Sequence, residues 1–293
     1  MPDIIYIVYA VLAGIVQGIT EWLPISSTGH LILLDSLFGG SLDPSVLTVE
    51  FKEMFDVVIQ FGSIIAIVVL YFRRLNPFAL SKSKSEKRET WSLWAKILIA
   101  AIPAGIIGVL FDDKLSETVF KEPQVKYIIA AALFFYGVLF IIIERRNKNK
   151  IYKITEPEGI DFRTALGVGA FQVLALIPGT SRSGSTIIGS TIMGVSRKAA
   201  AEFSFFLAIP VMLGASALKI FKFVRDAGGG IASAFTSTQF IVLGVGTVVS
   251  FLVSLVAVKF LVGFVRRHSF EGFGWYRIAL AIIVVVYFSL IVK

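Results

Sequence analysis

The chain has 293 residues, of which 56% are hydrophobic and only 16% charged, and this composition excludes an ordinary soluble domain. It contains no cysteine, which excludes disulfides and thiolate chemistry. Its net charge is +8, but the basic residues cluster in loops beside apolar runs, so we expect contacts with membrane lipid and none with nucleic acid. Several apolar runs are long enough to cross a bilayer, which predicts an all-α integral membrane protein.

The first half of the chain, residues 1–150, opens with an apolar run at residues 4–20 that leads into a polar motif. This motif covers residues 17–30 and reads Gln-Gly-Ile-Thr-Glu-Trp-Leu-Pro-Ile-Ser-Ser-Thr-Gly-His. The basic, Ser/Lys-rich stretch 73–96 is expected to be a solvated loop. Three spanning helices are expected in this half, at residues 50–72, 97–111 and 125–143.

The second half, residues 151–293, follows the same order. An apolar arm at residues 165–177 leads into a second polar motif, residues 178–186, which reads Pro-Gly-Thr-Ser-Arg-Ser-Gly-Ser-Thr. A short arm at residues 183–193 follows the break. Three further spans are expected, at residues 200–220, 238–262 and 274–292.

The two polar motifs interrupt apolar arms that are too short and too broken to be ordinary spans. Helical hairpins that enter a membrane and return are tolerated only when they are buried in protein or line an aqueous cavity. We therefore predict six transmembrane helices and two re-entrant hairpins. A shift of 155 residues aligns the two halves at identical residues: Ala10, Gly14, Gln17, Ser26 and Gly29 match Ala165, Gly169, Gln172, Ser181 and Gly184.

Each motif is followed by three spans, an odd number, so residues 151–293 are predicted to be inverted relative to residues 1–150. Inverted repeats with broken helices place a site near the middle of the membrane, where the repeats meet. The two motifs are thus expected to lie side by side.

Most of the 28 Lys and Arg residues fall on one predicted side of the membrane. They lie at residues 73–96, 144–163, 197–198 and 259–277. The positive-inside rule assigns this side to the cytoplasm, so the first hairpin opens to the outside and the second to the inside.

Arg182 is the centre of the second motif. A charged side chain at bilayer depth costs about 2.5–3.5 kcal/mol, which makes it a functional candidate. Pro178 and Gly179 end one helix, and Thr180 or Ser181 can cap the next. The free N–H groups of the new helix and Arg182 would then bind an anion, most simply a phosphate. The alternative is that this small-residue stretch is only a helix-packing surface.

In the first motif, Gln17 and Glu21 are four residues apart and share a face if the arm is helical. A carboxylate and an amide oxygen at this spacing suit a hard divalent cation, Mg²⁺ or Ca²⁺. Glu21 could equally be a proton relay or an ion ligand in a transporter.

Beyond the break at Pro24, Ser26, Ser27 or Thr28 can cap the following helix. If that helix starts near Ser27, His30 lies one turn further on, and the two form a nucleophile and a base. Alternatively, His30 is a structural histidine and the hydroxyls serve only as caps.

Together the motifs resemble those of the bacterial undecaprenyl pyrophosphate phosphatases, of the bacitracin-resistance type. The family's Glu/Gln-x-x-x-Glu motif is met by Gln17 and Glu21, and its Pro-Gly-x-Ser-Arg-Ser-x-x-Thr motif by residues 178–186. The resemblance covers essentially the whole chain. It implies an inner-membrane enzyme that removes one phosphate from a polyprenyl (C55) diphosphate carrier lipid with a divalent cation, and recycles the carrier for cell-wall synthesis. It also implies two inverted repeats and a homodimer, and the site is expected to open to the outer face.

The resemblance also implies a role for each motif residue. Arg182 stabilises the developing charge, Glu21 and Gln17 position the cation, and Ser27 is the nucleophile, with His30 as its base or as the acid for the leaving phosphate. A water activated by His30 remains the alternative nucleophile. Many family members carry Glu where this chain has Gln17, so Glu21 is the only carboxylate of its motif. Further substrate contacts are expected from Ser26, Thr28, Gly179, Thr180, Ser181, Ser183 and Thr186.

Two other functions fit the same architecture. A flippase or transporter would use Arg182 to bind an anionic head group without breaking a bond, but such a carrier has no need of Ser27 and His30 beside Glu21. A lipid phosphatase with a phosphohistidine needs a second catalytic histidine. His268 is the only other histidine, and it is expected in a basic loop on the opposite face.

Overall fold

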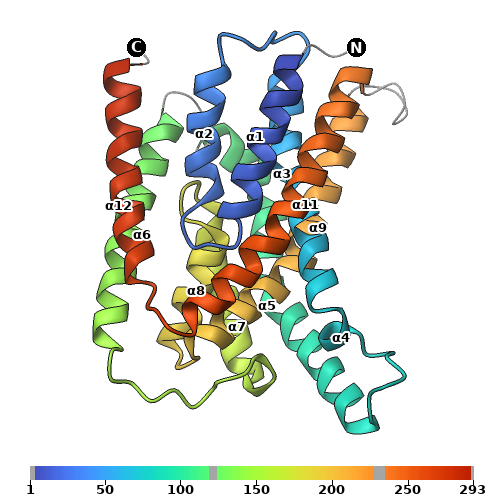
Figure 1. Cartoon of the computed structure of the whole chain (residues 1–293), viewed down its shortest axis with the longest axis vertical. Coiled ribbons are helices and arrows are strands. Elements are labelled where there is room, and N and C mark those ends of the chain that lie inside the picture. The colour runs from blue at the N-terminus through green and yellow to red at the C-terminus, as the bar shows by residue number, and fades with distance from the viewer. Residues whose placement is uncertain (1–3, 119–123, 227–234, 292–293) are drawn as a thin grey trace.

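A computed structural model describes residues 4–118, 124–226 and 235–291 (Figure 1). Six helices in this part of the chain are long and apolar enough to cross a membrane. The chain is therefore a multi-pass membrane protein, and the six predicted spans are confirmed. The helices are α3 (Val49–Leu70), α5 (Lys84–Thr118), α6 (Gln124–Arg146), α9 (Arg197–Asp226), α11 (Ser237–Val265) and α12 (Glu271–Val286), the last continued by a π-helical turn, η3 (Tyr287–Ile291).

The expected loop at residues 73–96 is mostly helical, which corrects the sequence prediction. A short helix, α4 (Phe72–Leu75), follows α3, and α5 already begins at Lys84. Ser83 and Glu86 cap α5 reciprocally: the Ser83 N–H donates to Glu86 Oε2 at 2.6 Å, and the Glu86 N–H donates to Ser83 Oγ at 3.3 Å. This Ser-x-x-Glu capping box starts the helix within a polar sequence.

Four shorter helices form two pairs. The first pair is α1 (Ile4–Thr20) and α2 (Ser27–Phe38), and the second is α7 (Phe162–Val173) and α8 (Arg182–Ile192). A 3₁₀ turn, η2 (Leu174–Leu176), extends α7, and another, η1 (Pro157–Gly159), precedes it. These helices have 17, 12, 12 and 11 residues, fewer than the roughly 20 that a transmembrane helix needs.

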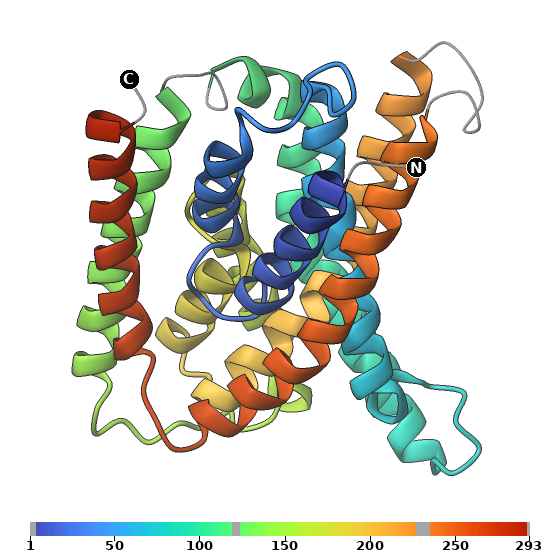
Figure 2. The same ribbon diagram turned by 45° about the horizontal axis from the view of Figure 1, so that its top comes forward.

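The two pairs point in opposite directions. In Figure 1, α1 descends from the top of the molecule to mid-height and α2 returns to the top, whereas α7 and α8 reach mid-height from the bottom. Figure 2 shows α1 and α2 lying between the α6–α12 pair and the long, tilted α11. Both breaks therefore lie inside the helix bundle.

Small residues let the helices approach closely where α1 crosses α11. A Cβ atom on Gly14 would lie 2.7 Å from the carbonyl oxygen of Gly246, and one on Gly18 would lie 2.8 Å from that of Ser250. Both distances are shorter than any normal carbon–oxygen contact. Apolar side chains gain little free energy when they leave lipid for the protein interior. Close packing and hydrogen bonds between helices therefore hold the bundle together.

Candidate active site

Ser26 and Ser181 occupy matching positions at the two breaks. Their φ angles are +73° and +71°, a left-handed conformation that non-glycine residues rarely adopt. Each caps the helix that follows it: Ser26 Oγ accepts from the Gly29 N–H at 3.4 Å, and Ser181 Oγ accepts from the Gly184 N–H at 3.1 Å. Strained conformations of this kind, which cost about 1–3 kcal/mol each, cluster at functional sites.

The two breaks meet in space although they are far apart in sequence. Arg182 Nη2 donates to Glu21 Oε1 at 3.0 Å, and Ser183 Oγ donates to the Leu23 carbonyl at 3.4 Å. The predicted contact between residues 17–30 and 179–186 is thus confirmed. The N-terminal ends of α2 and α8 both start at this contact.

Glu21 is almost completely buried, and both of its carboxylate oxygens have partners. Oε2 accepts from Gln17 Nε2 at 2.8 Å, while Oε1 binds Arg182. The other amide atom, Gln17 Oε1, is buried without a hydrogen-bond partner in the described part of the chain.

Gln17 and Glu21 could supply only part of the coordination sphere of a divalent cation. The described residues contain no group of three acidic, histidine or cysteine side chains that could hold a metal ion. Mg²⁺ is, however, commonly held by one or two protein oxygens together with substrate phosphates. The unpartnered Gln17 Oε1 beside the Glu21 carboxylate matches that kind of site.

Arg182 is fixed in orientation by α9 and by the turn that follows α1. Nη1 donates to the Ser204 carbonyl at 2.6 Å and to Ser204 Oγ at 3.2 Å, and the guanidinium lies 5.8 Å from the Trp22 ring centre. Thr186 Oγ1 lies 2.7 Å from Ser204 Oγ and steadies that partner. Nε is buried without a hydrogen-bond partner among the described residues, which leaves it available to an anion.

Ser27 and His30 are close in sequence but are not hydrogen-bonded to each other. The Ser27 side chain is partly exposed, and no hydrogen bond to it is found in the described part of the chain. His30 Nδ1 lies 2.7 Å from the Ser26 carbonyl, and Nε2 lies 2.7 Å from Tyr276 Oη. A carbonyl only accepts, so Nδ1 carries the proton and Nε2 of the neutral ring accepts from Tyr276.

The other predicted contact residues lie at the second break, except Thr28, which lies beside the first. Gly179 has φ +88°, and a Cβ there would lie 2.7 Å from the backbone of Ile129. The Thr180 hydroxyl is buried without a hydrogen-bond partner in the described residues, and Ser181 Oγ lies 3.1 Å from Ser183 Oγ. Thr28 is exposed at the start of α2. The predicted substrate-contact residues thus lie along these two breaks and the helix starts that follow them.

Arg277 requires a correction, because the sequence prediction counted it among the cytoplasmic charges at residues 259–277. It is fully buried in α12, and its guanidinium bonds to the backbone of both breaks. Nη1 donates to the Pro24 carbonyl at 3.1 Å, and Nη2 donates to the carbonyls of Gly179 and Thr180 at 2.9 and 3.0 Å. No carboxylate pairs with it in the described part of the chain. The signal that pointed to Arg182, a charge within an apolar span, applied equally to Arg277.

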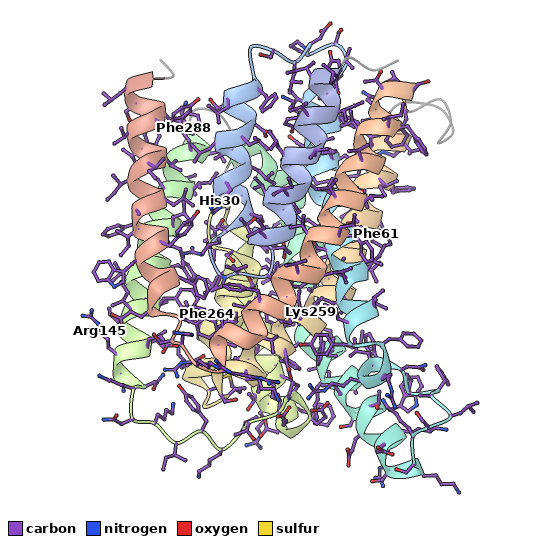
Figure 3. All side chains as sticks on the ribbon, viewed as in Figure 1. His30, Phe61, Arg145, Lys259, Phe264 and Phe288 are labelled. Carbon is purple, nitrogen blue, oxygen red and sulfur yellow. The ribbon has the colours of Figure 1, made fainter. Side chains whose placement is uncertain are left out.

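His268 lies far from this cluster. Its Nδ1 is 3.3 Å from the Phe264 carbonyl, in the turn after α11. Figure 3 places Phe264 in the lower half of the molecule and His30 in the upper half. The two histidines therefore do not share a site, as predicted.

The charges at the breaks favour an anion. One buried carboxylate, Glu21, pairs with Arg182, and a second guanidinium, that of Arg277, bonds to the backbone of both breaks. The starts of α2 and α8 add about half a positive charge each through the helix dipole and unpaired N–H groups. The cluster is therefore positive overall, as a phosphate or diphosphate site requires.

Comparison with known proteins gives consistent matches over nearly the full length. A family model described as bacitracin resistance protein BacA matches residues 10–283. The chain is 51% identical to an undecaprenyl-diphosphatase of Enterococcus faecalis, over 95% of this chain and 96% of that protein. It is 52% identical to an undecaprenyl-diphosphatase of Acetivibrio thermocellus, over 96% and 97%. It is 51% identical to undecaprenyl-diphosphatase 1 of Clostridioides difficile, over 96% of both chains.

Proposed function

The chain belongs to the BacA family of bacitracin resistance proteins, and we propose that it is an undecaprenyl-diphosphatase. The reaction is the hydrolysis of undecaprenyl pyrophosphate by one water to undecaprenyl phosphate and inorganic phosphate, which returns the carrier lipid to cell-wall synthesis. The observation that carries this proposal is the Arg182–Glu21 contact, which joins both polar motifs at the starts of two helices. A flippase acting through the same site is the less favoured alternative, because the named relatives are phosphatases.

In the proposed mechanism, Arg182 and the free N–H groups at the starts of α2 and α8 hold the diphosphate. Ser27 Oγ attacks the terminal phosphorus, the bridging P–O bond breaks, and undecaprenyl phosphate leaves. Water then releases phosphate from Ser27. His30 takes the Ser27 proton only if Nε2 exchanges Tyr276 for the hydroxyl or for a bridging water; direct attack by such a water is the alternative.

A divalent cation is proposed as the cofactor, with Gln17 Oε1 and the Glu21 carboxylate as its protein ligands. When bound, it would neutralise negative charge on the diphosphate oxygens. This proposal is supported by the unpartnered amide oxygen of Gln17. Arg182 holds Glu21 in position for this role.

We further propose that the protein lies in the cytoplasmic membrane as two inverted repeats, residues 1–150 and 151–293, each with a re-entrant hairpin. The matching conformations of Ser26 and Ser181, and the opposite directions of the two short-helix pairs, support the repeats. The positive-inside rule then places the α1–α2 hairpin at the outer face, with the substrate tail in lipid. A homodimer follows from the family resemblance and is testable by the mass of the detergent-solubilised protein.

The deciding experiment is phosphate release from a polyprenyl diphosphate by the purified protein, with and without a chelator. Turnover that the chelator abolishes and added Mg²⁺ or Ca²⁺ restores supports both the phosphatase and the cation. Turnover unaffected by chelator retains the phosphatase and removes the cation. If no phosphate is released while the lipid moves between the leaflets of proteoliposomes, the protein is a flippase.

A further inference from the structure

A groove runs along the surface between the end of α3 and the lower half of α11, away from the candidate active site. Its volume is about 360 Å³, and both apolar and polar groups line it. Two cationic side chains, Lys259 and Arg266, are part of its lining. Figure 3 labels Lys259 on the lower half of α11, in the half of the molecule nearer the side that we assign to the cytoplasm. The groove residues are Leu70, Tyr71, Val258, Lys259, Val262, Gly263 and Arg266.

The two cations share one face of α11 and leave space between them. They are seven residues apart, which is about 10 Å along the helix axis and about two turns. A Cβ on Gly263, midway between them, would meet no atom within 4 Å. Both long side chains can therefore bend over Gly263 towards one ligand.

Neither cation is satisfied by the protein itself. In the described part of the chain, the side chains of Lys259 and Arg266 make no hydrogen bond or ion pair, and both are exposed. Lys259 is the only charged residue of α11, whose span has a mean hydropathy of 2.6. An unpaired charge facing lipid is costly unless it extends to the interface and finds an opposite charge there.

We propose that this groove is a binding site for an anionic glycerophospholipid of the leaflet at this end of the molecule. The phosphate would lie between Lys259 and Arg266 above Gly263, and one acyl chain would lie along Val258 and Val262. Basic pockets between transmembrane helices on the cytoplasmic side are typical sites for anionic lipid head groups.

The groove also contacts the helix that positions the catalytic arginine. Tyr71 packs edge-on against Phe206 of α9, with ring centres 5.0 Å apart. Ser204, two residues earlier on α9, is the partner that fixes Arg182. The lipid would therefore brace α3 and α11 against the helix behind the site.

The test is native mass spectrometry of the delipidated full-length protein in detergent, titrated with phosphatidylglycerol. Phosphatidylcholine with the same acyl chains tests the need for net negative charge, and glycerol phosphate tests whether the head group alone suffices. Lys259→Gln/Arg266→Gln removes both cations. The matched control, Lys84→Gln/Arg88→Gln, removes an exposed Lys and Arg at the start of α5.

We expect one tightly held phosphatidylglycerol per chain, weakened about 30-fold in the groove variant, since each cation near a lipid surface contributes about a fivefold factor. The control should change affinity less than about threefold. Equal binding by both double variants, or by phosphatidylcholine, overturns the proposal. Displacement of the lipid by glycerol phosphate would identify a free-phosphate site instead.

If the double variant does not fold, Arg266→Gln alone should weaken phosphatidylglycerol about fivefold, whereas Lys259→Arg should retain it. Unchanged lipid binding by Arg266→Gln contradicts the proposal. Because the readout is lipid mass and not turnover, it is independent of whether the chain hydrolyses undecaprenyl pyrophosphate. Both residues lie outside the catalytic cluster, and the melting temperature in detergent reports whether each variant is folded.

Discussion

Arg182 and Glu21 form the only direct ion pair between the two halves of the site among the described residues. The pair is buried, with exposed side-chain fractions of 12% for Arg182 and 6% for Glu21. Arg182 also donates to the Ser204 carbonyl, and Glu21 also accepts from Gln17. Because the pair is desolvated, removing one partner leaves the other charge buried and unpaired. Changes at Arg182 are therefore expected to affect stability as well as turnover.

Arg182→Ala should lower turnover by about 100–1000-fold, the loss typical of one donor that stabilises transition-state charge. Arg182→Lys should recover only part of it, because lysine supplies the charge without the planar pair of donors. Both rates are measured as phosphate release per folded, monodisperse protein in detergent. Near-normal turnover by Arg182→Ala would show that the arginine is structural.

The stability of this variant needs its own control, because Glu21 keeps only the Gln17 hydrogen bond when Arg182 is removed. The double variant Arg182→Ala/Glu21→Gln, which buries no charge at this position, should therefore melt at a higher temperature than Arg182→Ala alone. If the two variants melt at the same temperature, the unpaired buried carboxylate does not destabilise the protein and the ion pair does not stabilise the fold.

Gln17 and Glu21 allow a separate test of the cation. Gln17→Glu adds a second carboxylate and should lower the Mg²⁺ or Ca²⁺ concentration needed for half-maximal phosphate release. Glu21→Gln leaves two neutral amides, which bind these cations poorly, and should abolish most of the cation-dependent turnover. A Glu21→Gln protein with unchanged rate and cation dependence would remove Glu21 from the site.

The sequence identified the residues that the motifs supply and missed those that packing supplies. Ser204, Tyr276 and Arg277 all contact motif residues, but they come from α9 and α12, outside both motifs. Helical spacing suggested that His30 pairs with Ser27. In the structure, one ring nitrogen of His30 is hydrogen-bonded to the Ser26 carbonyl and the other to the Tyr276 hydroxyl. Such competition for a hydrogen-bonding group depends on tertiary contacts that local spacing does not encode.

At the scale of helices, the breaks were predictable because they have local causes. Pro24 and Pro178 interrupt apolar arms, and serine residues that can cap follow each of them. The start of α5 was missed because Ser83 and Glu86, which form its capping box, lie in a Ser/Lys-rich sequence that was interpreted only by its composition. The positive φ angles at Ser26 and Ser181 were not predictable, because serine has no local preference for that conformation.

Gly62 tests whether close helix contacts hold the bundle. A Cβ on this residue of α3 would lie 2.1 Å from the Thr247 carbonyl oxygen of α11, so the helices would have to separate. Gly62→Ala should destabilise the protein by about 1–3 kcal/mol, the usual cost of overpacking. Gly244→Ala is the matched control on α11, because nothing lies within 4 Å of its added Cβ and alanine favours a helix. Melting in detergent should therefore fall for Gly62→Ala only; equal melting of both variants would contradict the close contact.

At the scale of the whole molecule, the two halves of the chain are joined at the site by a residue of the last helix. Arg277 reaches the first break through the Pro24 carbonyl and the second through the carbonyls of Gly179 and Thr180. The predicted inverted repeats implied that the two breaks meet, but they did not identify the residue that fixes the position of one break relative to the other. The guanidinium suits this role because its fixed planar donors reach several acceptors at once.

Replacing Arg277 should therefore disturb the two halves together. Arg277→Met keeps much of the side-chain volume but removes every donor, leaving three backbone carbonyls to find other partners. Turnover should fall by at least about tenfold, and KM should rise as well, because misaligned breaks weaken both substrate binding and transition-state contacts. Arg277→Lys should recover part of both, since an ammonium still donates to carbonyl groups. The matched control is Arg145→Met, which removes an exposed ion pair with Glu271 between α6 and α12 and should change stability and turnover little.

A distance measurement separates this positioning role from a purely structural one. Because the chain has no cysteine, spin labels can be placed by cysteine substitution at Thr28 and Ile177, exposed positions beside the first and second breaks. In the parent protein, the label-to-label distance should have one narrow distribution. Arg277→Met should broaden it, and Arg277→Lys should partly narrow it again, in step with the recovery of KM. If Arg277→Met loses turnover while the distance distribution stays narrow, the guanidinium acts on the substrate charge directly and not by aligning the breaks.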